Sequence, residues 1–365
     1  MNSPGAEGIN VYSGALHIHS VRSDGGGTAE EIAAAADEAG LDYLVLTDHD
    51  TDGSAREDQG YRSGVLVVAG SEVAIPEAHI VYIPDPDSPF YSNEYLQDSV
   101  YFLKDKAIRM IAHPFLPKRP LTGDVAHLFD GIELINADEL WRQTSIFRVI
   151  EAFLTYPLFD YSMNTMVFVP EKNRDLWYGA NNAFQGSEPG NGNSIFSFIG
   201  SVDAHENIKL TKERRWRFPA YQRMFRTVQT HIVTRGAFTG DYAHDVRLLY
   251  GALKNGNSFV SFESMGRTEG FSFFAESPDS MYIAGSATEA KTVDKFEIRS
   301  PYTEGVKIYL KTAGQIIAEK EGPVLVYENP EKGVYYAEVC QIHRTLPFGT
   351  TEERTWIITN AIVLN

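Results

Sequence analysis

Up to about residue 262, the chain alternates short apolar runs with helical patterns, and most of the runs end in His, Asp or Glu. The first unit pairs the strand-like "GALHIHS" with the helical "TAEEIAAAADEAG". Further strand-like runs are "DYLVLTDHD", "GVLVVAGSEV", "HIVYI", "IRMIAHP", "DGIELIN", "SFIGSVDAH" and "THIVT". Strands that alternate with helices form parallel sheets, whose carboxyl ends share one edge. The polar residues at these ends are therefore expected to meet.

The first strand-like run predicts a face made of two imidazoles. Period-two alternation puts His17 and His19 on one face, and it puts Leu16 and Ile18 on the other, packed outward. Asp24 follows before three glycines, which let the chain turn sharply.

The helix after this loop has recognisable ends. Thr28 and Glu31 have the spacing of a capping box, and Gly40 is a typical helix stop. A helix is therefore predicted between Thr28 and Gly40.

Imidazoles and carboxylates at or just after the strand ends are candidate metal ligands. They are His17, His19, Asp24, His49, Glu72, His79, His113, Asp203 and His205. If these side chains crowd together where the strands end, their burial and like charges would be unfavourable without bound cations. This donor set, which lacks thiolate, favours Zn, Mn or Fe, and its size suits two or three divalent ions. The other histidines are interpreted as structural: His127, His231, His244 and His343.

After Gly266 the pattern changes to short β-rich runs separated by turn residues, which is typical of a small β-sandwich. We expect an α/β domain over 1–262 and a β-sandwich domain over 267–365. An aromatic-rich insertion at about 137–195 is expected to contain a helix and to lie where it could cover the site.

Composition narrows the class of partner. The formal charge of −17 (32 basic against 49 acidic residues) argues against a broad grip on duplex nucleic acid. No run approaches the roughly 18–20 apolar residues of a membrane span. The lone Cys340 cannot form an internal disulfide. A cytoplasmic location is expected by default, and a periplasmic or secreted one if a signal peptide has been removed. The sequence does not indicate an oligomeric state.

Taken in order, the motifs "HIHSVRSD", "LTDHDT", "GSEV", "EAHIVYI", "IAHP" and "SVDAHE" resemble those of the PHP (polymerase and histidinol phosphatase) superfamily. The resemblance covers residue 14 to about 262. It implies a distorted (β/α)7 barrel with a multinuclear metal site at its mouth. Together with an immunoglobulin-like sandwich at the end, the chain resembles stand-alone PHP proteins that act as metal-dependent phosphoesterases.

The resemblance also implies three ligand sets, with Glu72 as a bridge between the first two. The first set is His17, His19, Glu72 and Asp203. The second is Glu72, His79 and His113, and the third is Asp24, His49 and His205. Because Asp48 and His49 face opposite ways on a regular strand, only one of them should reach the metals unless the strand has ended. Asp48 is the alternative ligand or an outer partner.

The implied activity is hydrolysis of a small phosphate mono- or diester by a metal-bridging hydroxide. Asp48 and Arg22 are the candidate catalytic side chains, with Asp48 holding or relaying a proton. Cations near the mouth should bind the phosphate. The candidates are Arg22, Lys118, Arg119, Arg214 and Arg215. The last two belong to "KERRWRFPAYQRMFR", for which a solvated surface is the alternative interpretation.

Two other functions fit the same residues. One is an amidohydrolase-type C–N bond hydrolase that uses the same hydroxide, and the other is a non-catalytic, metal-stabilised ligand-binding protein. Activity against phosphate esters, compared with amides and lactams, would separate them.

Overall fold

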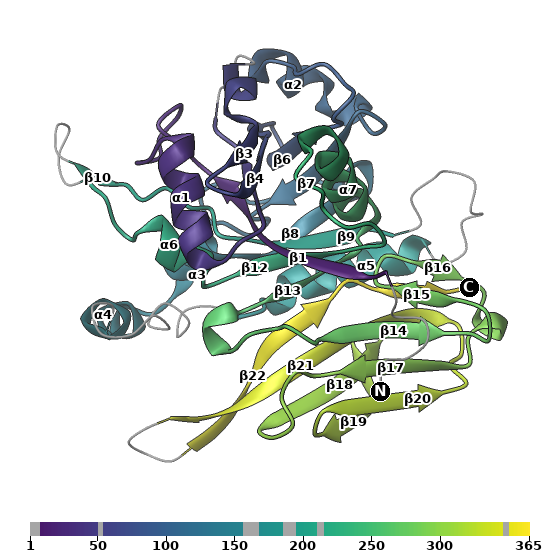
Figure 1. Cartoon of the computed structure of the whole chain (residues 1–365). Helices are drawn as coiled ribbons and strands as arrows, with labels where there is room; N and C mark the ends of the chain where they lie inside the picture. The colour runs from purple at the N-terminus through teal and green to yellow at the C-terminus, as the bar shows by residue number, and fades with distance from the viewer. Residues whose placement is uncertain (1–7, 50–53, 156–167, 185–194, 210–214, 346–349) are drawn as a thin grey trace.

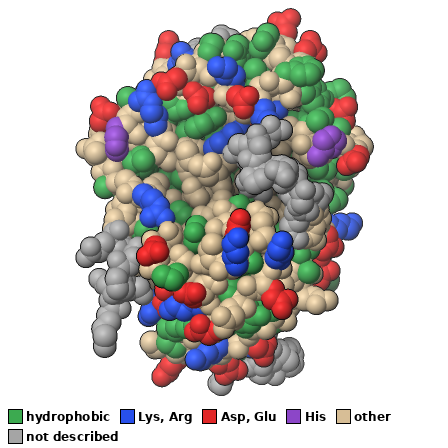
Figure 2. Space-filling model, turned by 90° about the vertical axis from the view of Figure 1, so that its right-hand side faces the viewer, with side chains coloured by type: hydrophobic (Ala, Val, Ile, Leu, Met, Phe, Trp, Pro, Cys, Tyr) green, Lys and Arg blue, Asp and Glu red, His purple; other side chains and the backbone are tan. Residues whose placement is uncertain are grey.

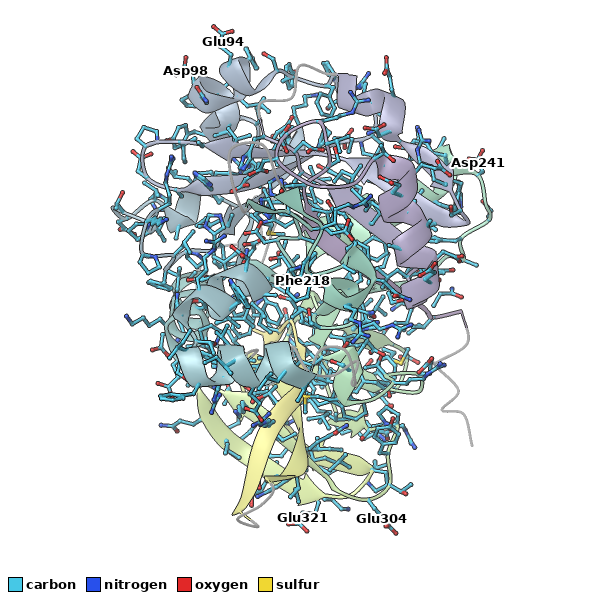
Figure 3. The ribbon with its side chains drawn as sticks, turned by 90° about the vertical axis from the view of Figure 1, so that its left-hand side faces the viewer. Glu94, Asp98, Phe218, Asp241, Glu304 and Glu321 are labelled. Atoms are coloured by element: carbon cyan, nitrogen blue, oxygen red, sulfur yellow. The ribbon has the colours of Figure 1, made fainter. Side chains whose placement is uncertain are left out.

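The computed structural model describes residues 8–49, 54–155, 168–184, 195–209, 215–345 and 350–365. An α/β part occupies one end of the molecule and a β-rich part the other (Figure 1). Figure 3 marks the two ends, with Glu94 and Asp98 on α2 at one and Glu304 and Glu321 at the other. Among the described residues, no helix is both long and apolar enough to cross a membrane.

The helices and strands have the following bounds along the chain. The α-helices are α1 (Ala29–Ala39), α2 (Asn93–Ser99), α3 (Ala137–Gln143), α4 (Ile146–Thr155), α5 (Glu171–Phe184), α6 (Tyr221–Phe225) and α7 (Tyr242–Asn255). The strands of the α/β part are β1 (Asn10–Ile18), β2 (Tyr43–Leu46), β3 (Gly60–Arg62), β4 (Val65–Ala69), β5 (Ser71–Ala74), β6 (His79–Pro84), β7 (Ala107–Ala112), β8 (Gly131–Asn136), β9 (Ser197–Ser201), β10 (Ile208–Lys209), β11 (Arg215–Trp216), β12 (Gln229–Thr234) and β13 (Ser258–Ser261). Those of the β-rich part are β14 (Ser272–Glu276), β15 (Met281–Ile283), β16 (Ala287–Thr288), β17 (Lys295–Arg299), β18 (Val306–Thr312), β19 (Gln315–Glu321), β20 (Val324–Glu328), β21 (Gly333–Thr345), β22 (Thr350–Thr359) and β23 (Ile362–Leu364).

The predicted first helix is confirmed together with both of its ends. Thr28 Oγ1 accepts a hydrogen bond from the Glu31 backbone N, and the Thr28 backbone N donates to Glu31 Oε2 over 2.9 Å. Gly40 takes the left-handed conformation, with φ 79°, that ends a helix. This capping box fixes where the loop carrying Asp24 rejoins regular structure.

Two sheets build the α/β part. In one, β1, β2 and β4 run parallel, while β1 pairs with β12 in the antiparallel sense. In the other, β7, β8 and β9 are parallel, but the β5–β6 and β6–β7 pairs are antiparallel. Isolated bridges join the two sheets, at Ile18↔Ala204 and at His49↔Glu72. The carboxyl ends of the parallel strands therefore meet, as the sequence pattern predicts.

The fold is thus mixed α/β, with more strands than helices among the described residues. The antiparallel pairs depart from a regular seven-fold repeat, and three of the seven described α-helices lie in the insertion at about 137–195. The seven-fold barrel stays a prediction.

The β-rich part continues one sheet of the α/β part. Strand β22 pairs with β13, so the first sheet runs on through β21 and β18. A second sheet, in the order β15-β14-β17-β20, contributes Phe273 and Phe296 to a hydrophobic cluster that also contains Leu310 and Trp356 from the first. The two sheets therefore share one core, while an immunoglobulin-like arrangement stays a prediction.

The insertion at about 137–195 was expected to contain one helix and contains three among its described residues, α3, α4 and α5. Its residues 156–167 and 185–194 lie outside the described part of the chain. Helix α5 packs on β8, and its Trp177 is fully buried and donates from Nε1 to the Phe196 carbonyl over 2.8 Å. Arg174 of α5 also pairs with Glu338 of β21, at 3.3 Å. This helix belongs to the core that joins the two parts, whereas α4 stands away from the sheets (Figure 1).

Candidate metal centre

The predicted ligands lie together where the strands end. We call the following residues the His/carboxylate cluster: His17, His19, Asp24, His49, Glu72, His79, His113, Asp203 and His205. They come from β1, β5 and β6 and from the segments just after β1, β2, β7 and β9. Residues from both ends of the α/β sequence are thus brought to one place.

Glu72 lies at the centre of the cluster and is only 3% exposed. Its Oε2 is 3.1 Å from His17 Nε2, 3.3 Å from His19 Nε2 and 3.4 Å from His49 Nδ1. Its Oε1 is 2.5 Å from His79 Nδ1 and 3.0 Å from His113 Nε2. Each oxygen of this carboxylate therefore faces a different group of imidazoles, as a bridging carboxylate would.

Asp203 forms a second centre next to the first. Its Oδ1 lies 3.6 Å from His17 Nε2, 3.4 Å from His19 Nε2 and 3.5 Å from His205 Nδ1. His17 and His19 thus stand between the carboxylates of Asp203 and Glu72.

Asp24 reaches the cluster from its loop, with Oδ1 3.3 Å from His205 Nε2 and 3.7 Å from His19 Nδ1. The glycines beside it are required by close packing. A Cβ on Gly25 would lie 1.9 Å from the His19 carbonyl oxygen, and one on Gly26 would lie 2.4 Å from that of Glu206. The loop is pressed against the backbone that carries the other ligands.

Three sets of ligand atoms are close enough to hold an ion, each with its atoms within 4.8 Å of one another. The sets are His17, Glu72 and His113; His17, His19 and Asp203; and His19, Asp24, His49 and His205. They share His17 and His19, so three positions for ions would be neighbours. His79 is outside these sets but contacts Glu72.

The hydrogen bonding of the imidazoles fits metal ligation. Nε2 of His17, both ring nitrogens of His19 and Nδ1 of His113 are buried and make no hydrogen bond within the described residues. Buried polar atoms normally have a partner. A divalent cation would provide one for nitrogens that face carboxylates.

The charges of the cluster also call for cations. Burial lowers the pKa of His19, but the nearby carboxylates of Asp203 and Glu72 outweigh it and raise the pKa to about 9. For Glu72, burial raises the pKa, but His17 and the other imidazoles hold it well below its usual range. The buried carboxylates therefore require positive charge, and divalent cations supply it as protons do.

Glu133 is a site residue that sequence reasoning missed. It is fully buried in β8, and its Oε1 accepts from His17 Nδ1 over 2.6 Å. Its Oε2 accepts from the His113 backbone N and from Asn136 Nδ2, both at 2.7 Å. Because the carboxylate can only accept, Nδ1 of His17 carries the proton and its Nε2 lone pair points into the cluster. The signal in the sequence was a lone carboxylate within the apolar run "GIELIN".

The backbone at three cluster residues adopts a left-handed conformation. His17, His113 and Asp203 have φ values of 61°, 28° and 48°. This conformation is strained for residues other than glycine, and such strain concentrates at functional sites. The pairing of β1 with β2 shifts register between Leu16 and Ile18, at the position of His17.

This irregularity corrects the predicted alternation along β1. Leu16 and Ile18 do not share one face: they belong to different hydrophobic clusters, and Ile18 lies in that of Ala15. The rings of His17 and His19 still lie together, because the left-handed backbone at His17 directs its ring toward Glu72 and Asp203.

The two candidate catalytic side chains do not lie among the ligands. Asp48, which is 1% exposed, accepts from the Ser20 backbone N and from Ser20 Oγ, both at 2.7 Å, and from Ser23 Oγ at 2.5 Å. It therefore holds the start of the Asp24 loop. Arg22 pairs with Asp58 and, at 3.6 Å, with Glu57.

The predicted phosphate-binding cations are spread out. Arg119 is exposed, with Nη1 3.2 Å from His79 Nε2, at the edge of the cluster. Lys118 is exposed on the same loop. Arg215 is in β11, and Arg214 lies outside the described residues.

No family model matches the chain. A phosphoribosyl 1,2-cyclic phosphate 1,2-diphosphodiesterase of Eggerthella lenta is 43% identical over 61 residues, which is 16% of this chain and 23% of that relative. The match thus spans less than a quarter of the relative's length.

Two solved structures are similar to the chain. One is a two-domain protein from Bacteroides vulgatus, described as containing a PHP-like metal-dependent phosphoesterase, with 13% identity, 97% of both chains covered and a TM-score of 0.41. The other, from Bifidobacterium adolescentis, is described as a metal-dependent phosphoesterase, with 14% identity, 53% of this chain and 87% of that chain covered, and a TM-score of 0.33.

Proposed function

We propose that the chain is a metal-dependent hydrolase of phosphate esters. The observation that carries this proposal is the contact of one buried carboxylate, Glu72, with five imidazoles, next to ligand sets that share His17 and His19. Shared ligands hold ions side by side, and adjacent divalent cations suit in-line attack on phosphorus.

The proposed ligands are the members of the His/carboxylate cluster, and two or three ions of Zn, Mn or Fe are proposed from the donor set. Such ions supply a water that is acidic enough to react at neutral pH and positive charge for the phosphoryl oxygens. His205 belongs to the set that contains Asp24, and Asp203 belongs to the neighbouring set with His17 and His19. His79 lies on the opposite side, at Glu72.

The surrounding residues orient the ligands. Glu133 fixes the tautomer of His17, and Asn136 Nδ2 links Glu133 to Asp203 Oδ2, which it reaches over 3.3 Å. Asp48 holds the loop from which Asp24 enters the cluster. Asp48 is thus proposed as a positioning residue, in place of the proton carrier that the sequence suggested.

A distorted barrel is the proposed frame of the site. The bridges Ile18↔Ala204 and His49↔Glu72 close the gaps between the two sheets, which supports this proposal. We propose a domain division near residues 262–267, with the β-rich part as an accessory or packing domain.

The proposed substrate is a small phosphate mono- or diester. The net charge of −17, with acidic and basic side chains interspersed on the surface in Figure 2, gives no broad track for a long nucleic acid. The Eggerthella lenta relative acts, by its name, on a phosphodiester. Lys118 and Arg119 are proposed to attract the substrate at the His79 side.

The test is turnover of a phosphate-ester panel against an amide and lactam panel, with wild type and His17→Ala, before and after chelation. We expect phosphate release that chelation abolishes and metal addition restores, and no release by His17→Ala. His127→Ala, at an exposed histidine in the short helix Ala126–Leu128, is the matched control and should keep wild-type activity. Turnover of amides or lactams alone, or full activity without metal, would overturn the proposal.

A further inference from the structure

The arginines near the His/carboxylate cluster are mostly engaged by acidic partners. Arg22 pairs with Glu57 and Asp58. Arg217 pairs with Glu31 at 3.0 Å and Glu206 at 2.7 Å. A cation that binds the substrate on the Asp203 side must therefore come from another element.

Helix α3 begins at the cluster and offers such a cation. Asn136 contacts Asp203 through Nδ2, and its Oδ1 caps α3 by accepting from the Glu139 backbone N over 2.9 Å. Asp138, the second residue of α3, is mostly buried. Burial and then the charge of Asp203 raise its pKa, which places this carboxyl in the electrostatic field of the cluster.

Arg142 lies one helical turn after Asp138 and is held by it. Its Nε donates to Asp138 Oδ2 over 2.5 Å. Asp138 lies in the first turn of α3, which Asn136 joins to Asp203, so the guanidinium is tied to the end of the helix that meets the cluster. The contact with Asp138 raises the pKa of Arg142, and the charge of Asp203 acts in the same direction.

The rest of the guanidinium is available. The Arg142 side chain is 52% exposed, and neither Nη group donates to a described residue. A guanidinium that is anchored through Nε keeps a fixed plane, and two Nη groups in that plane match two oxygens of a phosphate.

We propose that Arg142 contacts the phosphoryl oxygens of the substrate on the Asp203 side of the cluster, with Asp138 as its positioning residue. This inference rests on the proposed function and deepens it by assigning a phosphate-binding role to the insertion. It replaces Arg22 as the main cation for the substrate. The alternative is that Arg142 only neutralises Asp138.

Affinity for inorganic phosphate, measured by calorimetry on metal-loaded protein, tests the contact without turnover. Arg142→Gln should bind phosphate roughly tenfold more weakly, as expected for a lost charge-assisted contact, with unchanged metal content by elemental analysis. Arg142→Lys should fall between, because it keeps the charge and loses the planar fork. Arg247→Gln is the matched control, since Arg247 is 53% exposed and also paired with an aspartate, Asp87.

The Asp138→Asn background separates the two roles of Arg142. If Arg142 contacts phosphate, Asp138→Asn/Arg142→Gln should still bind roughly tenfold more weakly than Asp138→Asn. Equal affinities in this background would show that Arg142 only neutralises Asp138, and would overturn the inference. So would unchanged affinity in Arg142→Gln, or no phosphate binding by the wild type.

Turnover distinguishes this failure from that of the proposed function. If wild type hydrolyses phosphate esters, Arg142→Gln should raise KM more than it lowers kcat. Ester hydrolysis with normal phosphate affinity in Arg142→Gln would contradict the inference alone. Arginine-dependent phosphate binding without hydrolysis of any ester would contradict the proposed function alone.

Discussion

Strand β8 has one buried carboxylate just before its amino end, Asp130, and a second, Glu133, that faces its carboxyl end, and the two ends balance this charge in different ways. At the amino end, Asp130 accepts from Arg109 Nε over 3.1 Å and from Lys254 Nζ over 2.9 Å. Arg109 donates further to the carbonyls of Val100 and Tyr101. At the carboxyl end, Glu133 faces His17 and, through Asn136, Asp203.

The difference lies in the cations. The amino end has permanent cations whose donors bind carbonyls and a carboxylate, so the network is complete within the chain. The carboxyl end has imidazoles, several of whose buried nitrogens lack a hydrogen bond. A complete network indicates a structural role, whereas an incomplete one indicates a site for exchangeable cations.

The largest expected effect is at the centre of the carboxyl end. Glu72→Gln removes the charge that faces five imidazoles, so at least one ion should be lost. Turnover should fall by more than the roughly 10–100-fold that is lost when a residue that hydrogen-bonds to a metal ligand is replaced. Elemental analysis and phosphate release measure this. Glu94→Gln, at an exposed glutamate of α2 (Figure 3), should change neither, and wild-type metal content in Glu72→Gln would remove Glu72 from the ligands.

A substitution at the amino end should lower the stability of the protein and leave its metal content unchanged. Arg109→Met leaves Asp130 buried with one cation fewer, which should lower the free energy of unfolding by about 3–5 kcal/mol. Denaturant unfolding of metal-loaded protein measures this, and Arg247→Met, in an exposed pair, should cost no more than about 1 kcal/mol. Loss of bound metal from folded Arg109→Met would erase the contrast between the ends.

Glu133 tests the carboxyl end through a residue that is not a proposed ligand. Glu133→Gln keeps the shape but weakens the hold on His17 Nδ1, and metal affinity or activity should fall about 10–100-fold. A competitive chelator titration gives the affinity. Wild-type metal affinity together with wild-type activity in Glu133→Gln would contradict the role given to the carboxyl end.

The smallest expected effect is a pH dependence confined to chelated protein. Contacts that raise the pKa of His19 to about 9, above its ordinary 6.5, stabilise the fold fully below about pH 6.5. This contribution is lost as the pH rises through about 9. Unfolding of chelated protein should therefore become easier over this range, whereas bound ions should remove this dependence. Identical pH profiles with and without metal would contradict it.

The sequence predicted what depends on local pattern. The caps of α1 follow from Thr28, Glu31 and Gly40, which act within a few residues of one another. The candidate ligands meet because each follows a strand, and strand ends converge in sheets of this kind. Their roles as ligands stay predictions.

Other features depend on contacts between distant segments. Glu133 acts on His17 across 116 residues, and nothing near it in sequence marks this partner. The left-handed backbone at His17 is invisible in an alternating pattern. The pairing of β22 with β13 joins the last strands to a sheet edge formed much earlier in the chain. Arg142 was overlooked because the sequence does not show that the helix that carries it begins at Asn136, beside Asp203.

Anomalous diffraction from crystals grown with Mn²⁺ or Zn²⁺ tests the central claim most directly. We predict two or three peaks within the His/carboxylate cluster, adjacent to the sets that share His17 and His19, and none beside Asp130. A cluster without an anomalous peak, in crystals of protein that hydrolyses phosphate esters, would contradict the account.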